Sequence, residues 1–90
     1  MVKLVKVKIY GKVQGVFFRE SARYEAKQLG INGLVRNERG GSLYFEAEGD
    51  EEHLKKFIDW CRKGPEMALV QKIDIEYLDE LKFYKTFELE

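Results

Sequence analysis

Several residue types that mark common protein classes are scarce in this 90-residue sequence. Its single cysteine, Cys61, excludes an internal disulfide and makes a reducing, cytoplasmic environment the expected one. No apolar run approaches the roughly 18 residues that a membrane-spanning helix needs, so we expect no membrane partner. The first eight residues alternate lysine with valine and leucine, and they lack the continuous apolar stretch of a secretory signal.

Net charge is also absent, because 16 Lys and Arg residues balance 16 Asp and Glu residues. The charges are nevertheless unevenly placed. Residues 1–39 hold nine basic and three acidic side chains, whereas residues 40–90 hold seven basic and thirteen acidic ones. A neutral whole argues against a nucleic-acid partner, which would need a surplus of positive charge. A locally basic N-terminal half suits a small anionic ligand.

The hydrophobic pattern predicts one domain of mixed structure over residues 1–90. Alternation predicts five strands: one ending near Gly11, one over 31–37, one over 43–47, one over 73–77, and a short last one with Phe83, Phe87 and Leu89. Helical spacing predicts one helix from about Arg19 to Leu29 and a second that Asp50 caps and Gly64-Pro65 stops. This order predicts an α+β, ferredoxin-like split βαβ sandwich, with two helices on one face of a mostly antiparallel sheet. Right-handed crossovers place the first and third strands in the centre.

One segment, Gly11 to Arg19, joins the first strand to the first helix and reads Gly-Lys-Val-Gln-Gly-Val-Phe-Phe-Arg. Glycines in such a turn let consecutive backbone N–H groups face an anion, and a helix N-terminus adds unpaired donors. Arg19 supplies a planar fork that can bind phosphate or carboxylate through two hydrogen bonds. From these residues alone, an ordinary turn with a surface arginine is an equal alternative.

A second segment, Gly33-Leu34-Val35-Arg36-Asn37, places an asparagine at the end of the second strand. If the first and third strands are central, this strand end and the loop before Arg19 could meet on one side of the sheet. The Asn37 side chain offers one acceptor and two donors, which is enough to orient a water molecule. A plain turn asparagine before a hairpin is the alternative.

Together these two segments resemble the acylphosphatase family. Residues 11–19 match each fixed position of the family's phosphate loop, Gly-x-Val-Gln-Gly-Val-x-Phe-Arg. Residues 33–37 and 41–42 fit its second signature, and weaker agreement continues as far as Val70. The resemblance therefore covers nearly the whole chain.

The resemblance implies a hydrolase of small acyl phosphates that releases inorganic phosphate and uses no metal or other cofactor. It implies that Asn37 positions the nucleophilic water and that Arg19 binds phosphate with the loop. That loop comprises Val13, Gln14, Gly15, Val16, Phe17, Phe18 and Arg19. The chemistry agrees, because a carboxylate leaving group, whose conjugate acid has a pKa of about 4–5, departs without a general acid. Since an amide is too weakly basic to take the proton of water, a substrate phosphate oxygen would receive it.

The chain departs from the family pattern at two positions, and two rival interpretations of its function have to be weighed. Phe17 stands where the family often has a smaller residue, and Leu34 stands where it often has tryptophan, which leaves substrate preference undecided. One rival is a module of the same fold that holds an anion without turnover. Acylphosphatase-like domains also occur inside larger carbamoyl-transfer proteins, although we expect this chain to act alone, as a monomer.

The other rival, an RNA-recognition domain, fits poorly. Residues 42–46 lack the basic-glycine-aromatic signature, and the outward face of that strand carries Glu46 and Glu48. No cluster of cysteines and histidines offers a metal site, so His53 is expected to be solvated and Cys61 to pack in the core.

Overall fold

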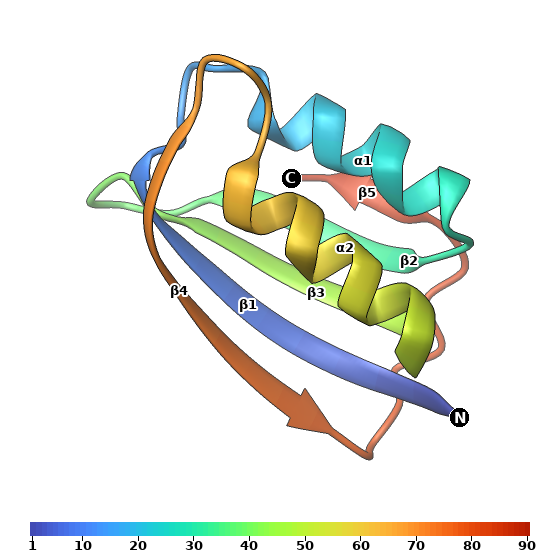
Figure 1. The fold of residues 1–90 in the computed structure, drawn as a ribbon. Coiled ribbons are helices and arrows are strands. Elements are labelled where there is room, and N and C mark those ends of the chain that lie inside the picture. The colour runs from blue at the N-terminus through green and yellow to red at the C-terminus, as the bar shows by residue number, and fades with distance from the viewer.

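The computed structural model describes all 90 residues. Along the chain lie β1 (Val2–Lys12), α1 (Phe18–Gln28), β2 (Asn32–Asn37), β3 (Leu43–Asp50), α2 (Glu51–Lys63), β4 (Leu69–Leu78) and β5 (Phe87–Leu89). The strands form one sheet in the order β4-β1-β3-β2-β5, and both helices cover the same face of it (Figure 1). Only the β2–β5 pair is parallel. The predicted ferredoxin-like α+β arrangement, with β1 and β3 inside the sheet, is confirmed.

The hydrophobic core fills the space between the sheet and the helices. Alternation along β1 points Val5, Val7 and Ile9 at the helices, and all three are fully buried. α1 contributes small side chains at Ala22 and Ala26, which let this helix lie close to the sheet. α2 contributes larger ones, and its buried Phe57 packs edge to face against Phe45 of β3 at 5.8 Å between ring centres.

Cys61 lies in the same core, at the buried face of α2. Burial raises the pKa of its thiol, so the side chain stays protonated and packs as a small apolar group. This placement agrees with the expectation from the spacing of apolar residues.

The last strand is shorter than expected, because Phe83 does not belong to it. Phe83 lies in the connection between β4 and β5, has a left-handed backbone with φ of 58°, and is 76% exposed. The aromatic residue fitted the alternating pattern, but the left-handed conformation is incompatible with a strand.

The connection over residues 79–86 must cross the sheet, because β4 and β5 lie at opposite edges (Figure 1). It passes the face opposite the helices, where the buried carboxylate of Glu48 holds it. Glu48 accepts hydrogen bonds from the main-chain N–H groups of Lys82 at 2.6 Å, Phe83 at 3.2 Å and Tyr84 at 2.8 Å. These three N–H groups lie outside the strands, and Glu48 supplies the acceptor that each of them needs. The bonds also fix the route of the chain to β5.

Glu46, two residues earlier on the same face of β3, is the second anchor. Its carboxylate accepts hydrogen bonds from Lys82 Nζ at 2.7 Å, from the Tyr44 hydroxyl at 2.6 Å and from the Tyr84 hydroxyl. Burial acts to raise the pKa of Glu46, but these bonds outweigh it and lower the pKa to about 2. The outward face of β3 is therefore covered at this point by residues 82–84.

This arrangement makes stability depend on acid. Since the folded pKa of Glu46 lies below the ordinary 4.5, its contribution is present above about pH 5 and is lost as the pH falls toward 2. We expect Glu46→Gln to lower the free energy of unfolding at pH 7 by about 2 kcal/mol and to flatten its dependence between pH 5 and 2. Urea denaturation at a series of pH values measures both effects. Glu76→Gln, at an exposed position of β4, is the control, and an equally steep profile for Glu46→Gln would contradict the assignment.

Candidate active site

The ends of β1 and β2 lie at the same edge of the sheet, because both strands run antiparallel to β3 between them. Ile9 and Asn37 both pair with Leu43 of β3, so they occupy one row of the sheet, about 10 Å apart. The loop that follows β1 therefore begins beside Asn37.

A cavity of about 240 Å³ opens where this loop, the start of α1 and the end of β2 meet. Its lining consists of Val13, Gly15, Phe17, Phe18, Arg19, Glu20 and Asn37. Arg19 is half-buried and Asn37 is exposed, so a small ligand can reach both side chains from solvent. The structure thus brings the two residues singled out in the sequence to one cavity.

The first turn of α1 supplies the donors of this cavity. Phe17 at the N-cap position has a left-handed backbone, with φ of 63° and ψ of 24°, and no side chain caps the helix. The helical hydrogen bonds start with the N–H of Ser21, which donates to the Phe17 carbonyl. Earlier amides of the turn have no intrahelical partner, and with the partial positive charge of the helix end they favour an anion.

Two glycines shape the loop for different reasons. Gly15 has φ of 74°, a left-handed conformation that other residues adopt at a cost. At Gly11, a side chain would bring its Cβ within 2.1 Å of the Leu69 main-chain oxygen. Gly11 thus lets β4 approach the end of β1, while Gly15 turns the chain toward the helix.

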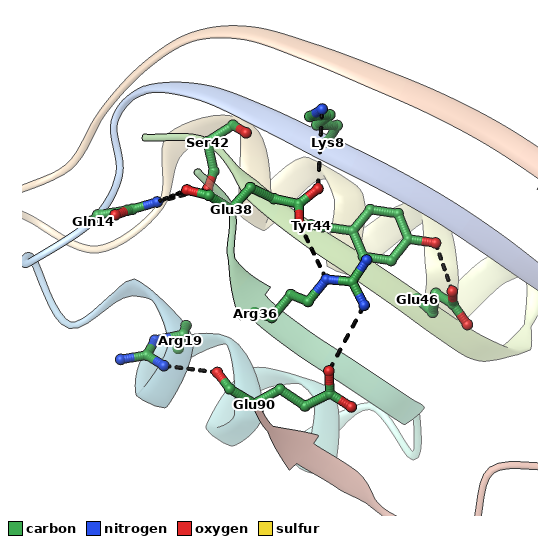
Figure 2. A network of polar contacts seen from close by, with 9 residues as sticks. All are labelled: Lys8, Gln14, Arg19, Arg36, Glu38, Ser42, Tyr44, Glu46 and Glu90. Carbon is green, nitrogen blue, oxygen red and sulfur yellow. Dashed lines mark hydrogen bonds and ion pairs between the residues drawn. The ribbon is translucent and has the colours of Figure 1, made fainter. Parts of the chain in front are cut away.

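Two of the seven predicted loop residues do not line the cavity. Val16 is buried in the core. Gln14 turns to the β2–β3 connection, where its Nε2 donates to the main-chain oxygens of Glu38 at 2.8 Å and Ser42 at 2.9 Å (Figure 2). The Gln14 side chain therefore ties the loop to the hairpin that carries Asn37.

Arg19 is held by a residue that sequence reasoning missed. Its Nη1 donates to the main-chain oxygen of Glu90 at 2.9 Å (Figure 2). Glu90 is itself fixed, since its N–H donates to the Val35 carbonyl at 2.8 Å and its side chain lies 3.8 Å from Arg36 Nη1. Arginine has five N–H donors, so the contact orients the guanidinium and leaves other N–H groups for a ligand.

Glu20 is the other lining residue that sequence reasoning missed. It directly follows Arg19 and occupies the first turn of α1, where a carboxylate is favourable to the helix dipole. Its position next to Arg19 in the sequence could have indicated that Glu20 lies at the cavity. The contact with Glu90 had no such signal, because the pairing of β5 with β2 brings it from the far end of the chain.

No group of three or more His, Cys, Asp or Glu side chains is placed to hold a metal ion. Neither helix has the length and apolar character needed to cross a lipid bilayer.

The comparison with known proteins agrees with this geometry. The family model for acylphosphatase matches residues 5–89. This chain belongs to the acylphosphatase family. Acylphosphatases are hydrolases of acid anhydrides, and hydrolysis of acyl phosphates fits the family.

Individual relatives match over most of their length. An acylphosphatase from Thiobacillus denitrificans is 41% identical over 73 residues, which is 81% of this chain and 82% of the relative. The solved acylphosphatase from Coxiella burnetii has a TM-score of 0.94 and 32% identity, covering 99% of this chain and 93% of its own. The acylphosphatase from Bacillus subtilis has a TM-score of 0.96 and 28% identity, and the match covers 100% of this chain and 99% of that one.

The bridging role of Gln14 is testable. Gln14→Ala removes both hydrogen bonds between loop and hairpin, and we expect it to lower the free energy of unfolding by about 1–2 kcal/mol. We also expect slower hydrolysis of acetyl phosphate by the folded protein, because Arg19 and Asn37 would no longer be held at a fixed separation. Urea denaturation and steady-state kinetics on the same samples measure the two effects.

Two further variants control this experiment. Gln14→Met keeps the approximate size of the side chain but has neither the donor nor a charge, so it should behave like Gln14→Ala. Gln28→Ala, at an exposed position of α1, should change neither quantity. Normal turnover in both Gln14 variants would show that the bridge does not serve the site.

Proposed function

We propose that this protein hydrolyses small acyl phosphates to a carboxylate and inorganic phosphate by attack of a positioned water molecule, without a metal. The cavity carries the proposal. In it, the guanidinium fork of Arg19 and the uncapped start of α1 lie beside the strand end that bears Asn37. Membership of the acylphosphatase family supports the same chemistry.

The phosphoryl group would bind at the start of α1. Its oxygens would accept hydrogen bonds from the loop amides and from the N–H groups of Arg19 that Glu90 does not occupy. A transferring phosphoryl group spreads its negative charge over its non-bridging oxygens, with the attacking and leaving oxygens roughly in line. Fixed donors aimed at those oxygens stabilise that charge without having to reorganise during the reaction.

Asn37 would hold the attacking water through its side-chain amide. The water oxygen forms a bond to phosphorus while the bond from phosphorus to the acyl oxygen breaks, and the carboxylate leaves with the electron pair. The carboxylate needs no proton, because its conjugate acid has a pKa of about 4–5. The water proton passes to a phosphate oxygen, so no side chain has to act as a base.

We infer that the 90 residues work as one monomeric domain whose partners are the acyl phosphate and inorganic phosphate, with neither a nucleic acid nor a membrane involved. The zero net charge supports the absence of a nucleic-acid partner. The single, buried and unpaired cysteine supports a reducing, cytoplasmic location.

Replacement of Arg19 tests the phosphate clamp. Lysine keeps the positive charge but loses the planar fork, so Arg19→Lys cannot bind phosphate bidentately. We expect kcat/KM for acetyl phosphate to fall on the order of 100-fold while the fold persists. Arg23→Lys, at an exposed position of α1, should keep the activity of the parent protein. All assays contain excess chelator. If the parent protein were inactive in chelator and regained activity when a divalent ion was added, the metal-free mechanism would be contradicted.

Replacement of Asn37 separates an enzyme from a protein that only binds an anion. An interaction made mainly in the transition state lowers kcat, whereas one made equally in the ground state shows in KM. We expect Asn37→Ala to lower kcat by roughly 10²–10³-fold, with affinity for inorganic phosphate, measured by calorimetry, nearly unchanged.

The control lies at the other end of the same strand. Asn32 donates a hydrogen bond from its Nδ2 to the Tyr84 carbonyl at 3.1 Å, far from the cavity. Asn32→Ala should therefore lower the melting temperature but leave turnover of the folded protein normal. If Asn37→Ala behaved in that way, or lost phosphate binding together with turnover, the water-holding role would be wrong.

A further inference from the structure

A second hollow of about 510 Å³ opens next to the phosphate cavity, between the exposed side of α1 and the chain after α2. Its lining from α1 includes Glu20, Ser21, Tyr24 and Glu25, which spacings of three and four residues place on one side of the helix. Its other lining residues are Phe17, Trp60 and Pro65. This open depression, which we name the acyl groove, is large enough for a small acyl group.

The acyl groove and the phosphate cavity are adjacent, because Phe17 and Glu20 line both. The groove shares no residue of β2 with the cavity, so it extends from the α1 side, away from Asn37. In-line displacement places the leaving group on the side of phosphorus opposite the attacking water. A substrate whose water is held at Asn37 therefore directs its acyl group toward the groove.

Phe17 is an unusual residue at this junction. Its backbone is left-handed, which glycine or asparagine adopts more readily than a bulky aromatic residue. Phe17 is 69% exposed, so packing in the core does not account for this residue. Tyr24, two helical turns further along α1, is 64% exposed as well. Two exposed aromatic residues thus line the groove beside the phosphate cavity.

We propose that the acyl groove binds the acyl part of the substrate and that Phe17 and Tyr24 favour an apolar, aromatic and uncharged acyl group. Aromatic rings contribute apolar area and stacking, which an aromatic acyl group can use and an acetyl group cannot. The carboxylates of Glu20 and Glu25 disfavour an acyl group that carries a negative charge. This inference rests on the proposed hydrolysis, since it assigns the groove to the leaving group of that reaction.

Non-hydrolysable analogues, in which a carbon–phosphorus bond replaces the anhydride, test the groove separately from turnover. Calorimetry on the parent protein compares benzoylphosphonate, acetylphosphonate and succinylphosphonate. We expect benzoylphosphonate to bind most tightly. Succinylphosphonate, whose acyl group carries an additional carboxylate, should bind most weakly. Tyr24→Ser and Phe17→Gly should each lower the ratio of benzoylphosphonate to acetylphosphonate affinity by about 3- to 10-fold.

Phe83→Gly is the matched control. Phe83 is also an exposed phenylalanine with a left-handed backbone, but it lies in the β4–β5 connection and lines neither hollow. This variant loses a similar ring and relieves similar backbone strain, so it should leave the affinity ratio unchanged.

The outcomes distinguish the two proposals. An unchanged ratio in both Tyr24→Ser and Phe17→Gly, an equal change in Phe83→Gly, or tightest binding of succinylphosphonate would overturn the acyl groove. Kinetics with benzoyl phosphate and acetyl phosphate follow on the same variants. If neither is hydrolysed while the aromatic preference persists, the proposed hydrolysis fails, and the groove remains only as a site that selects aromatic ligands.

Discussion

The antiparallel pairing of β1 with β3 determines where each part of the candidate site lies. Its register runs from Val2 opposite Asp50 to Ile9 opposite Leu43, and β2 meets the other side of β3 with Asn37 also opposite Leu43. A slip of two residues in either pairing would keep the same side chains in the core but would move one strand end by about 7 Å. Arg19 and Asn37 could then no longer contact one small ligand. The buried faces of both strands exclude a slip of one residue, which would turn the core side chains outward, and the close packing of those side chains opposes a slip of two.

Side chains that connect distant segments complete what the strand register begins. Gln14 joins the loop to the β2–β3 hairpin, and Glu48 holds the segment that leads to β5. β5 in turn places the main-chain oxygen of Glu90 against Arg19. A site that acts by position and charge needs such supports, because small displacements of its donors weaken both. The missing side-chain cap at Phe17 also serves the site, because a capping side chain would occupy N–H donors that a phosphate can use.

Much of the fold and of the candidate site could be predicted from the sequence. The parts that could not be predicted depend on contacts between distant segments. Alternation and helical spacing predicted the order of elements, and the segment ending at Arg19 pointed to the cavity now found there. Gln14 was expected in the loop, but whether its side chain faced the ligand or the hairpin depended on contacts between distant segments. Glu48 matched an outward position of a strand, and nothing local to it indicates that residues 82–84 cover it. Local patterns assign a side chain to a face of the sheet but do not say what lies on that face.

The position of β1 in the sheet also has a consequence for how the chain folds. β1 is the first strand along the chain, yet Leu4 pairs with Glu48 on one side and with Leu78 on the other. Both contacts close long stretches of chain at an entropic cost, and domains dominated by such non-local pairing fold on the order of milliseconds to seconds. The cavity depends on the same pairings, so a partly folded chain would possess α1 and its loop without Asn37 beside them. Phosphate binding would then emerge only with the final cooperative step, and a ligand added during refolding would stabilise the product without guiding the early search.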